Sequence, residues 1–418
     1  MTDRGKHAAA AVDARFDEHI AFLIELVRLP SPLGQVRPAQ ELLYRRLRQM
    51  GLDATIADLD PDMIVRHEAY APTPWSHAGQ PNVWGTLPPT GEGGRSLVLN
   101  GHIDVVPAEP LDWWSYDPWG GEIADGRMYG RGALDMKSGL VAGLLAIQAT
   151  LDAGIDRLGA IVFESVTEEE CTGNGMLAQR ITTGPVDGAI ILEPTALTTW
   201  TATPGVVWFT VRVTGKPAYV GRSADFVNAV ESAAAMIGRL KAAAVPALNA
   251  AFTHPGFGHL DNPLTLSVGK IEGGAWPSSV PLESTFTCRM SYPLDWSFDD
   301  VRGFVSEQVR AASQPDGWLA GHLPTVAFDG FRASGWDGNS ESDLNQALAR
   351  AHQAELDSSL RHSVFPGTAD ARYFGRDEQV TYYGPAGGGI HGPDEYVEIE
   401  SVRHTARTLA RFIAEWCG

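Results

Sequence analysis

Cysteine is scarce in this chain. Three cysteines, Cys171, Cys288 and Cys417, are spread over 418 residues, and no two of them have the CxxC spacing of a redox or zinc motif. A few distant cysteines, odd in number, do not build the disulfide framework that stabilises small secreted proteins. We therefore expect free thiols and a reducing compartment.

Basic residues and long apolar runs are also few. The 32 lysines and arginines are outnumbered by 51 acidic residues, which leaves a net charge of -19. Nucleic acids and anionic membranes attract clustered positive charge, so neither is an expected partner. The first 16 residues mix charges with alanines and lack the apolar centre of a signal peptide. No apolar run reaches the length that we expect of a membrane span, and these absences together predict a cytoplasmic protein.

The chain is long enough for more than one packed core. Its 418 residues give room for roughly two to three domains of about 150 residues each. With 44% hydrophobic and 20% charged residues, the composition is that of a folded globular protein and argues against disorder or a coiled coil. We find neither an internal repeat nor a low-complexity segment.

Helical and strand patterns alternate along the first half of the chain. Helices are predicted at 12–29, 40–50 and 139–152, and strands after Thr55 and at 96–100, 160–166 and 188–192. Such alternation predicts a three-layer α/β/α domain with a mostly parallel central sheet. Ligands of such sheets collect beyond the carboxyl ends of the strands.

The pattern changes after Pro194. Strands are predicted at 206–213, 264–268, 284–290 and 325–331, and helices at 224–240 and 298–312. This order predicts a smaller two-layer α/β sandwich, and a helix at 342–356 then resumes the first domain. We therefore expect one domain formed by residues 1–202 and 333–418, with residues 203–332 inserted into it.

Five polar side chains occur in separate apolar or glycine-bounded motifs. They are two histidines and three carboxylates, namely His102, Asp135, Glu170, Glu193 and His391. Neutral imidazole and anionic oxygen form the ligand mixture that zinc, cobalt and manganese accept. The set predicts a metal-assisted hydrolase, although each residue alone has a simpler interpretation.

The first two motifs show this ambiguity. His102 and Asp104 lie two residues apart at a strand end, so both can point the same way, and Asp104 could accept the second ring N–H of His102. The alternative is a solvent-facing turn. Asp135 precedes a helix, where its carboxylate could bridge two cations or simply cap the helix.

The remaining motifs allow two interpretations as well. Glu168, Glu169 and Glu170 follow a strand directly. A run of charge is usually a solvated loop, but hydrolysis also needs one acid on the metal and an adjacent one free to carry a proton. Glu193 could face an arginine or solvent at its strand end, and His391 could be an ordinary surface histidine in a glycine-rich loop.

Taken together and in this order, the motifs resemble the co-catalytic dinuclear zinc metallopeptidase and deacylase family, which includes acetylornithine deacetylase, succinyl-diaminopimelate desuccinylase, aminoacylase and glutamate carboxypeptidase. The resemblance covers nearly the whole chain. It implies that His102 and Glu193 hold one divalent ion, that Glu170 and His391 hold a second, and that Asp135 bridges them. Zinc is the metal implied first, with cobalt and manganese as alternatives.

The resemblance also implies a mechanism. The family spacing, counted back from Gly175, makes Glu169 the general acid and base: it accepts a proton from the metal-bound water that attacks an amide and returns it to the departing amine. Family members carry a cis peptide after the bridging aspartate, here Asp135-Met136. The inserted domain is expected to be ferredoxin-like and to serve as a lid and as the interface of a homodimer.

Two positions depart from the family pattern. Tyr219 stands where a histidine usually reaches the partner's site, and Ser278 stands where asparagine is common. A phenol can donate the same hydrogen bond as the histidine. The alternatives are that Tyr219 only packs and that Ser278 belongs to a plain turn.

Further residues are candidates for substrate binding. Arg289 matches a family arginine that binds a substrate carboxylate, a task that suits a guanidinium. A second matching segment would line the pocket with Gly367, Thr368 and Arg372. For each arginine the alternative is a structural salt bridge. Three neighbouring tryptophans could wall an aromatic pocket or be ordinary packing, namely Trp113, Trp114 and Trp119.

These inferences predict a hydrolase that removes the acyl group from an N-acyl amino acid or a related small amide. A dipeptidase or carboxypeptidase of the same family is the alternative within enzymes. A catalytically silent homologue that binds a small molecule is the alternative outside them, but no ligand is missing and Glu169 is present. A nucleotide-binding oxidoreductase is a weaker third possibility, because residues 387–392 lack GxGxxG spacing.

Overall fold

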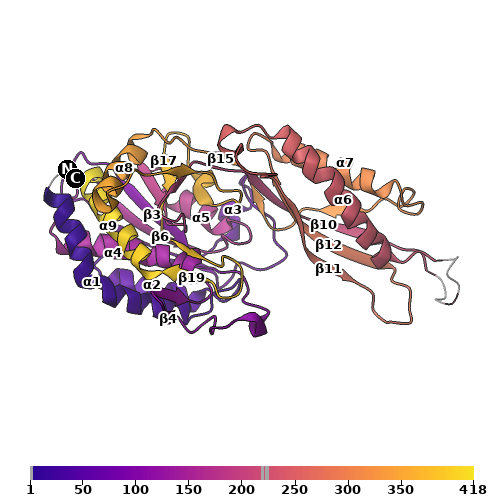
Figure 1. Ribbon diagram of the computed structural model, residues 1–418, viewed down its shortest axis with the longest axis horizontal. Coiled ribbons are helices and arrows are strands. Elements are labelled where there is room, and N and C mark those ends of the chain that lie inside the picture. Colours follow the sequence, from indigo (N-terminus) through magenta and orange to yellow (C-terminus); the bar gives the residue numbers. More distant parts are fainter. Residues whose placement is uncertain (1–2, 218–220, 222–225) are drawn as a thin grey trace.

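The computed structural model describes residues 3–217, 221 and 226–418, which form two connected parts (Figure 1). Both ends of the chain lie in the larger part. The middle of the sequence forms the smaller part, to the right in Figure 1.

The larger part is built on a six-stranded sheet with the order β1-β2-β6-β3-β7-β17. Five of its strands run in one direction, and β2 alone runs the opposite way, antiparallel to both β1 and β6. The strands are β1 (Asp53–Asp58), β2 (Pro81–Leu87), β3 (Leu97–His102), β6 (Ile161–Val166), β7 (Gly188–Ile191) and β17 (Gln379–Tyr382). The mostly parallel sheet is thus confirmed, with antiparallel strands at one edge.

Strand β3 shows why this sheet is covered on both faces. Leu97 and Leu99 point into the large core, whereas Val98 points the other way, into a cluster with Trp200 and Tyr382. Because alternate residues of a strand face opposite sides, a strand apolar at every position needs helices on both. The large core also holds α1 (Asp3–Val27), α2 (Arg37–Gln49), α4 (Ser138–Asp152), α8 (Asp343–Leu356) and α9 (Ile399–Trp416). On the opposite face lie α5 (Asn174–Thr183) and α3 (Pro61–Ile64), so the three-layer α/β/α class is confirmed.

Two helices differ from the sequence-based prediction. Helix α1 begins at Asp3, nine residues before the expected start, because Ala8 and Val12 continue its buried stripe. The stretch Ala133–Asp152 is long and apolar enough to cross a membrane, contrary to our expectation. In this fold 83% of its apolar window is buried, as in the core helix of a soluble protein.

The smaller part is a two-layer sandwich. Its sheet has the order β11-β12-β10-β13, with β14 pairing beside β10. The strands are β10 (Gly205–Thr214), β11 (Leu266–Gly273), β12 (Glu283–Tyr292), β13 (Thr325–Ala327) and β14 (Arg332–Ala333), and the helices are α6 (Ala229–Ala251) and α7 (Phe298–Ser313). Val207, Phe209 and Val211 of β10 point toward these helices. The strand expected at 325–331 is shorter, because the chain leaves the sheet after Ala327 and turns at Gly330, whose φ is +90°.

The chain enters and leaves the smaller part through neighbouring segments. Strand β9 (Ala202–Thr203) lies where the insertion begins and pairs with β15 (Trp336–Asp337), which follows the insertion. A four-stranded sheet of β4 (Glu122–Ala124), β5 (Arg127–Tyr129), β18 (Gly387–Gly388) and β19 (Tyr396–Glu398) and the pair of β8 (Thr199–Trp200) with β16 (His362–Ser363) complete the sheets. Short helical turns are η1 (Leu111–Trp113), η2 (Ala133–Lys137), η3 (Pro255–Phe257) and η4 (Asp370–Tyr373).

Candidate active site

The carboxyl ends of three parallel strands deliver most of the candidate ligands to one edge of the sheet. His102 is the last residue of β3, Glu193 lies just past the end of β7, and Glu169 and Glu170 lie just past the end of β6. These strands are direct neighbours, so side chains that follow them meet. His391 reaches the same place from the loop after β18, with a φ of +59°.

The five candidate ligands separate into two sets that share Asp135. His102 Nε2 lies 3.1 Å from Asp135 Oδ1 and 3.9 Å from Glu193 Oε1. His391 Nε2 lies 3.3 Å from Asp135 Oδ2 and 3.1 Å from Glu170. Each set therefore has one imidazole, one glutamate and one oxygen of Asp135. This is the sorting that the family resemblance implies.

Asp135 does not cap the following helix. Lys137 occupies the N-cap position of α4, without a side-chain cap bond, while Asp135 lies in the irregular turn η2. The peptide bond between Asp135 and Met136 is cis, as the resemblance implies. Glu395 fixes the turn from outside, because its Oε1 accepts the backbone N–H groups of Leu134 and Asp135, both at 3.0 Å.

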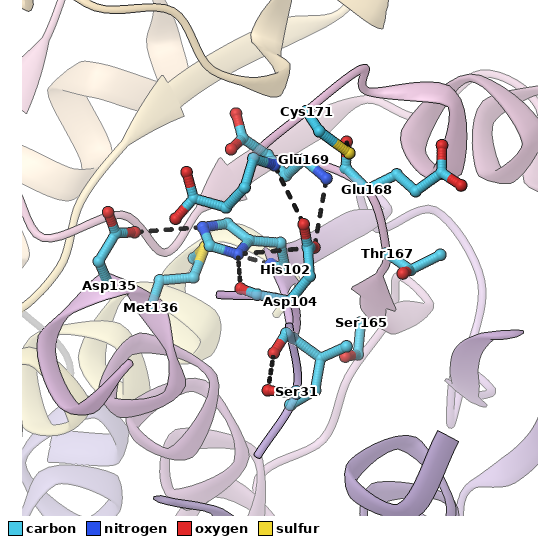
Figure 2. A network of polar contacts seen from close by, with 12 residues as sticks. Ser31, His102, Asp104, Asp135, Met136, Ser165, Thr167, Glu168, Glu169 and Cys171 are labelled. Carbon is cyan, nitrogen blue, oxygen red and sulfur yellow. Dashed lines mark hydrogen bonds and ion pairs between the residues drawn. The ribbon is translucent and has the colours of Figure 1, made fainter. Parts of the chain in front are cut away.

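Asp104 contacts different groups from those we expected. The ring Nδ1 of His102 donates to the backbone carbonyl of Asp104 at 2.8 Å, whereas the Asp104 carboxylate is 3.8 Å from that nitrogen (Figure 2). The carboxylate instead accepts the backbone N–H of Glu169 at 3.2 Å and of Glu170 at 3.1 Å. Asp104 therefore orients His102 through its main chain and holds the acidic loop through its side chain.

The hydrogen bond to the Asp104 carbonyl decides how His102 faces the cluster. A carbonyl oxygen can only accept, so Nδ1 carries a proton and the neutral ring presents the lone pair of Nε2 to Asp135. Two acceptors then face each other across 3.1 Å. Such a contact is favourable only with a second ring proton or a cation between them.

The pKa values also indicate that positive charge is needed in this cluster. Burial opposes a charged imidazole, yet Asp135 and Glu193 raise the pKa of His102 well above its ordinary value. Burial also acts against His391, but Glu170 and Asp135 raise its pKa to about 11. Burial raises the pKa of Glu193 well above its ordinary value. A carboxylate as buried as that of Glu193 needs more positive charge beside it than His102 supplies.

Divalent cations fit this set of residues. Within the part of the chain that the structure describes, no lysine or arginine lies within salt-bridge distance of the carboxylates of Asp135, Glu170 or Glu193. Ligand atoms of His102, Asp135 and Glu170 all lie within 4.8 Å of one another. The donor types are those of zinc and similar ions, and one aspartate contributes an oxygen to each set.

Glu169 belongs to neither set. Its side chain is 6% exposed, and Oε1 has no hydrogen-bond partner among the described residues. Burial, together with the carboxylates of Asp370 and Glu193, raises its pKa well above the ordinary value, against the effect of His102. A buried carboxyl group with a raised pKa and a free oxygen is suited to exchanging protons.

Glu168 secures the loop that carries its two acidic neighbours. It is fully buried with a φ of +63°. Its carboxylate accepts from His77 Nδ1 at 2.6 Å, Gln80 Nε2 at 3.0 Å and Thr172 Oγ1 at 2.8 Å. The run of three acids is thus not a solvated loop, because Glu168 and Glu169 are buried. Each of the three side chains has a different environment.

A cavity of about 340 Å³ opens onto this cluster. It is lined by candidate ligands, by Glu169 and by residues of both parts of the chain, including Arg289, Gly367 and Thr368. Arg289 comes from β12, and among the described residues no carboxylate pairs with it; its one polar contact is a long 3.5 Å bond to Ser291 Oγ. The structural salt bridge that we considered for Arg289 is absent there.

The other substrate-binding candidates lie elsewhere. Arg372 is not part of the cavity lining, because its guanidinium bonds to Thr368 Oγ1, the Ala369 carbonyl and Tyr373 Oη. Ser278 is exposed in the loop between β11 and β12 and does not line the cavity of its own chain. Tyr219 lies outside the described residues.

The tryptophans considered for an aromatic pocket do not form one. Trp113 is 69% exposed, and the indole of Trp114 donates to the Ala108 carbonyl. The cavity contains Trp200 and Trp208 instead. The sequence pattern does not distinguish these two, because each lies in a strand whose pattern indicates only packing.

Glu395 and Arg131 were also missed. Arg131 Nη1 donates to Glu395 Oε2 at 2.5 Å, and both side chains are nearly inaccessible. The signal for Arg131 was its position between two glycines just before Asp135, where a buried cation needs a partner. Nothing in the local pattern identified that partner 264 residues away.

Fold and site together define a two-domain metal-dependent hydrolase. Residues 98–415 match the family described as Peptidase family M20/M25/M40, and the chain belongs to this family. The match covers the parallel strands β3, β6, β7 and β17 of the sheet, apart from the first residue of β3, together with the insertion and all five candidate ligands.

Two similar curated proteins align along nearly the whole chain. An N-formyl-4-amino-5-aminomethyl-2-methylpyrimidine deformylase of Halalkalibacterium halodurans is 25% identical, over 98% of this chain and 96% of its own. A succinyl-diaminopimelate desuccinylase of Cereibacter sphaeroides is 26% identical, over 95% and 98%. Both names describe the removal of an acyl group.

Solved structures share the fold. The di-peptidase Dug1p from Saccharomyces cerevisiae superimposes with a TM-score of 0.84 at 14% identity, over 100% of this chain and 99% of its own. Human carnosine dipeptidase 1 superimposes with a TM-score of 0.77 at 19% identity, over 99% of each chain. At these identities the likeness concerns the arrangement of the two domains.

Proposed function

We propose that this protein hydrolyses the amide bond of an N-acyl amino acid or a related small amide, and that Glu169 is its general acid and base. The observation that carries the proposal is the position of Glu169, which lies in a cavity beside two ligand sets that share Asp135, with no hydrogen-bond partner for its Oε1 among the described residues. The acyl-removing relatives favour a deacylase.

Two divalent ions are the proposed cofactors. His102, Glu193 and one oxygen of Asp135 would hold one ion, and His391, Glu170 and the other oxygen would hold the second. When bound, such ions polarise an amide carbonyl and lower the pKa of a water molecule. We propose zinc, because imidazole and carboxylate ligands suit it, with cobalt and manganese as alternatives.

Glu169 performs the proton transfers in this proposal. Its free oxygen accepts a proton from the attacking water, and the same carboxyl group then donates it to the amine nitrogen as the C–N bond breaks. Asp104 holds the main chain of Glu169 and Glu170 in place during both transfers.

Arg289 is the proposed binding site for a substrate carboxylate. It lines the same cavity as Glu169, and the described residues include no other arginine or lysine in that lining. Burial lowers the pKa of its guanidinium, and the nearby carboxylate of Glu169 partly offsets this decrease. An unpaired, desolvated guanidinium gains most from a bidentate carboxylate that arrives with the substrate.

The test of this proposal is turnover before and after metal removal. The protein would be stripped of metal, reconstituted with zinc, cobalt or manganese, and assayed with N-formyl, N-acetyl, N-succinyl and N-carbamoyl amino acids and with dipeptides. Faster turnover of dipeptides than of every N-acyl amino acid would favour the dipeptidase alternative. Full activity of the metal-free protein would refute the metal-dependent mechanism.

Glu169→Gln provides the sharper test. The amide cannot exchange the proton, so we expect turnover to fall by about 10²- to 10⁴-fold while both metals stay bound. Glu25→Gln, an exposed position on α1, is the matched control and should retain activity. Undiminished turnover by Glu169→Gln would refute the assignment. Tight substrate binding without turnover by the wild type would favour the silent homologue.

We further propose a homodimer and a cytoplasmic location. The exposed strand β11 forms one edge of the insertion sheet and could pair with a second copy. Tyr219 would then reach the partner's site, as the resemblance implies. The separate hydrophobic core of the insertion supports the proposed division into residues 1–202, 203–332 and 333–418.

A further inference from the structure

We infer that the cavity has an aromatic subsite, which accepts an aromatic ring carried by the substrate. This inference rests on the proposed amide hydrolysis and specifies the substrate class. It is based on four aromatic side chains that line the cavity together with Glu169 and Arg289, namely Trp200, Trp208, Phe331 and Phe365.

The four rings form two pairs, one from each part of the protein. Trp200 and Phe365 come from the larger part and stack face to face, with centroids 4.1 Å apart and planes 7° from parallel. Trp208 and Phe331 come from the insertion and meet edge to face at 5.5 Å and 69°. The cavity is therefore bounded by aromatic surface on both the catalytic and the inserted side.

The direction of Trp208 follows from the register of β10. Val207 and Phe209, its neighbours in the strand, point into the core of the insertion and are at most 1% exposed. Trp208 must then point to the opposite face, where its direct cross-strand partner is Arg289. The indole and the guanidinium thus lie side by side on the face turned toward the metal-ligand cluster.

The indole is also fixed in position. Gly330 has a φ of +90°, and a Cβ built there would lie 2.6 Å from the Trp208 ring, so the backbone packs directly against it. The backbone N–H of Trp208 donates to the Phe331 carbonyl at 2.9 Å. A rigid ring binds a flat ligand at a low entropic cost.

The size and chemistry of the cavity match one ring with a short polar chain. About 340 Å³ is at the lower end of the range for small-molecule sites. Trp200 and Phe331 are buried, whereas Trp208 and Phe365 are partly exposed. A formyl or acetyl group would leave these two rings in contact with water, whereas an aromatic ring can pack against them. The substrate carboxylate would bind to the guanidinium of Arg289, next to the ring.

The reaction itself is the hydrolysis proposed above. Water adds to the amide carbonyl, the C–N bond breaks, the oxygen stays on the acyl product as a carboxylate, and the nitrogen leaves as an amine. The ring can belong to the acyl group, as in N-benzoylglycine, or to the amino acid, as in N-acetylphenylalanine. Both present an aromatic ring near a carboxylate, and the experiment separates them.

The experiment compares kcat/KM for N-benzoylglycine, N-acetylphenylalanine and N-acetylglycine in the metal-loaded enzyme. We expect at least one ring-bearing substrate to exceed N-acetylglycine by about tenfold, which corresponds to about 1.4 kcal/mol, and whichever does so locates the ring. Trp208→Leu and Phe365→Leu should each lower that ratio several-fold. Trp113→Leu, an exposed tryptophan outside the cavity, is the control and should leave the ratio unchanged. A wild-type preference for N-acetylglycine, or an unchanged ratio in both cavity variants, would overturn the inference.

A binding measurement separates failure of this inference from failure of the proposed function. If no amide is hydrolysed, quenching of tryptophan fluorescence by N-benzoylglycine and N-acetylphenylalanine would be followed in wild type and Trp208→Leu. Saturable binding by wild type that the variant weakens would support the aromatic subsite even though the proposed hydrolysis had failed. Absence of saturable binding of both ligands by wild type would overturn the subsite.

Discussion

The buried pair of Arg131 and Glu395 allows a quantitative test of how the Asp135 turn is held. The two side chains are 3% and 1% exposed and meet at 2.5 Å. Glu395 also accepts the main-chain N–H groups of Leu134 and Asp135. Glu395→Gln keeps the shape and these two bonds, but it turns an amide N–H toward the donors of Arg131.

The expected cost follows from that geometry. Removing one partner of a buried ion pair typically costs about 3–5 kcal/mol, because the other charge stays buried and uncompensated. Arg131 keeps a bond of 3.1 Å to the Gly392 carbonyl and lies over the Trp114 ring at 5.2 Å. We therefore expect a loss of about 3 kcal/mol of unfolding free energy for Glu395→Gln, the lower end of that range.

A double-mutant cycle checks the reasoning. Arg131→Met removes the other charge, and the combined variant removes both, so its loss should be smaller than the sum of the single losses by at least about 1 kcal/mol. Urea unfolding of the four proteins, followed by circular dichroism, measures the coupling. Single variants that each lose less than about 1 kcal/mol, or strictly additive losses, would show that the pair does not hold the turn.

Further predictions concern the metals, the packing and the acidic loop. His391→Ala should reduce the bound divalent metal from two ions to one per chain by elemental analysis, and unchanged content would contradict the two-set arrangement. Gly139→Ala should destabilise the protein by more than about 1–3 kcal/mol, because the added Cβ would lie 1.8 Å from the Leu192 carbonyl oxygen. Gly238→Ala, whose added Cβ would have nothing within 4 Å, should instead stabilise helix α6 by about 1 kcal/mol. Urea unfolding of both variants measures the two effects. Asp104→Asn should lower kcat/KM by about 10- to 100-fold, because the amide can no longer accept both loop N–H groups, and wild-type kinetics would show that these bonds are dispensable.

Much of the candidate site could be predicted because its residues follow strands. Apolar runs such as 96–100 and 188–192 identify buried strands, and the neighbouring carboxyl ends of parallel strands converge. His102 and Glu193 could therefore be assigned to one place without any structure. His391 and the choice between Glu169 and Glu170 depended on the family resemblance, because no local periodicity distinguishes them.

The aromatic surfaces and the supporting contacts could not be predicted in this way. Trp208 follows an ordinary alternating strand pattern, and which face of that strand turns toward the metal-ligand cluster depends on how the insertion docks onto the sheet. Arg289 was predicted to bind a substrate carboxylate, but only the structure reveals that none of the described carboxylates pairs with it.

The amino-acid sequence by itself determined the α/β class, the inserted sandwich and the identity of the acids and histidines at the strand ends, because these depend on patterns within a few residues. Tertiary structure decided which oxygen of Asp135 faces which histidine, that Asp104 holds the acidic loop, and that Glu395 fixes a turn 260 residues before it. Those contacts join segments that are distant in the chain. Their geometry is set by the packing of whole domains, which local sequence does not specify.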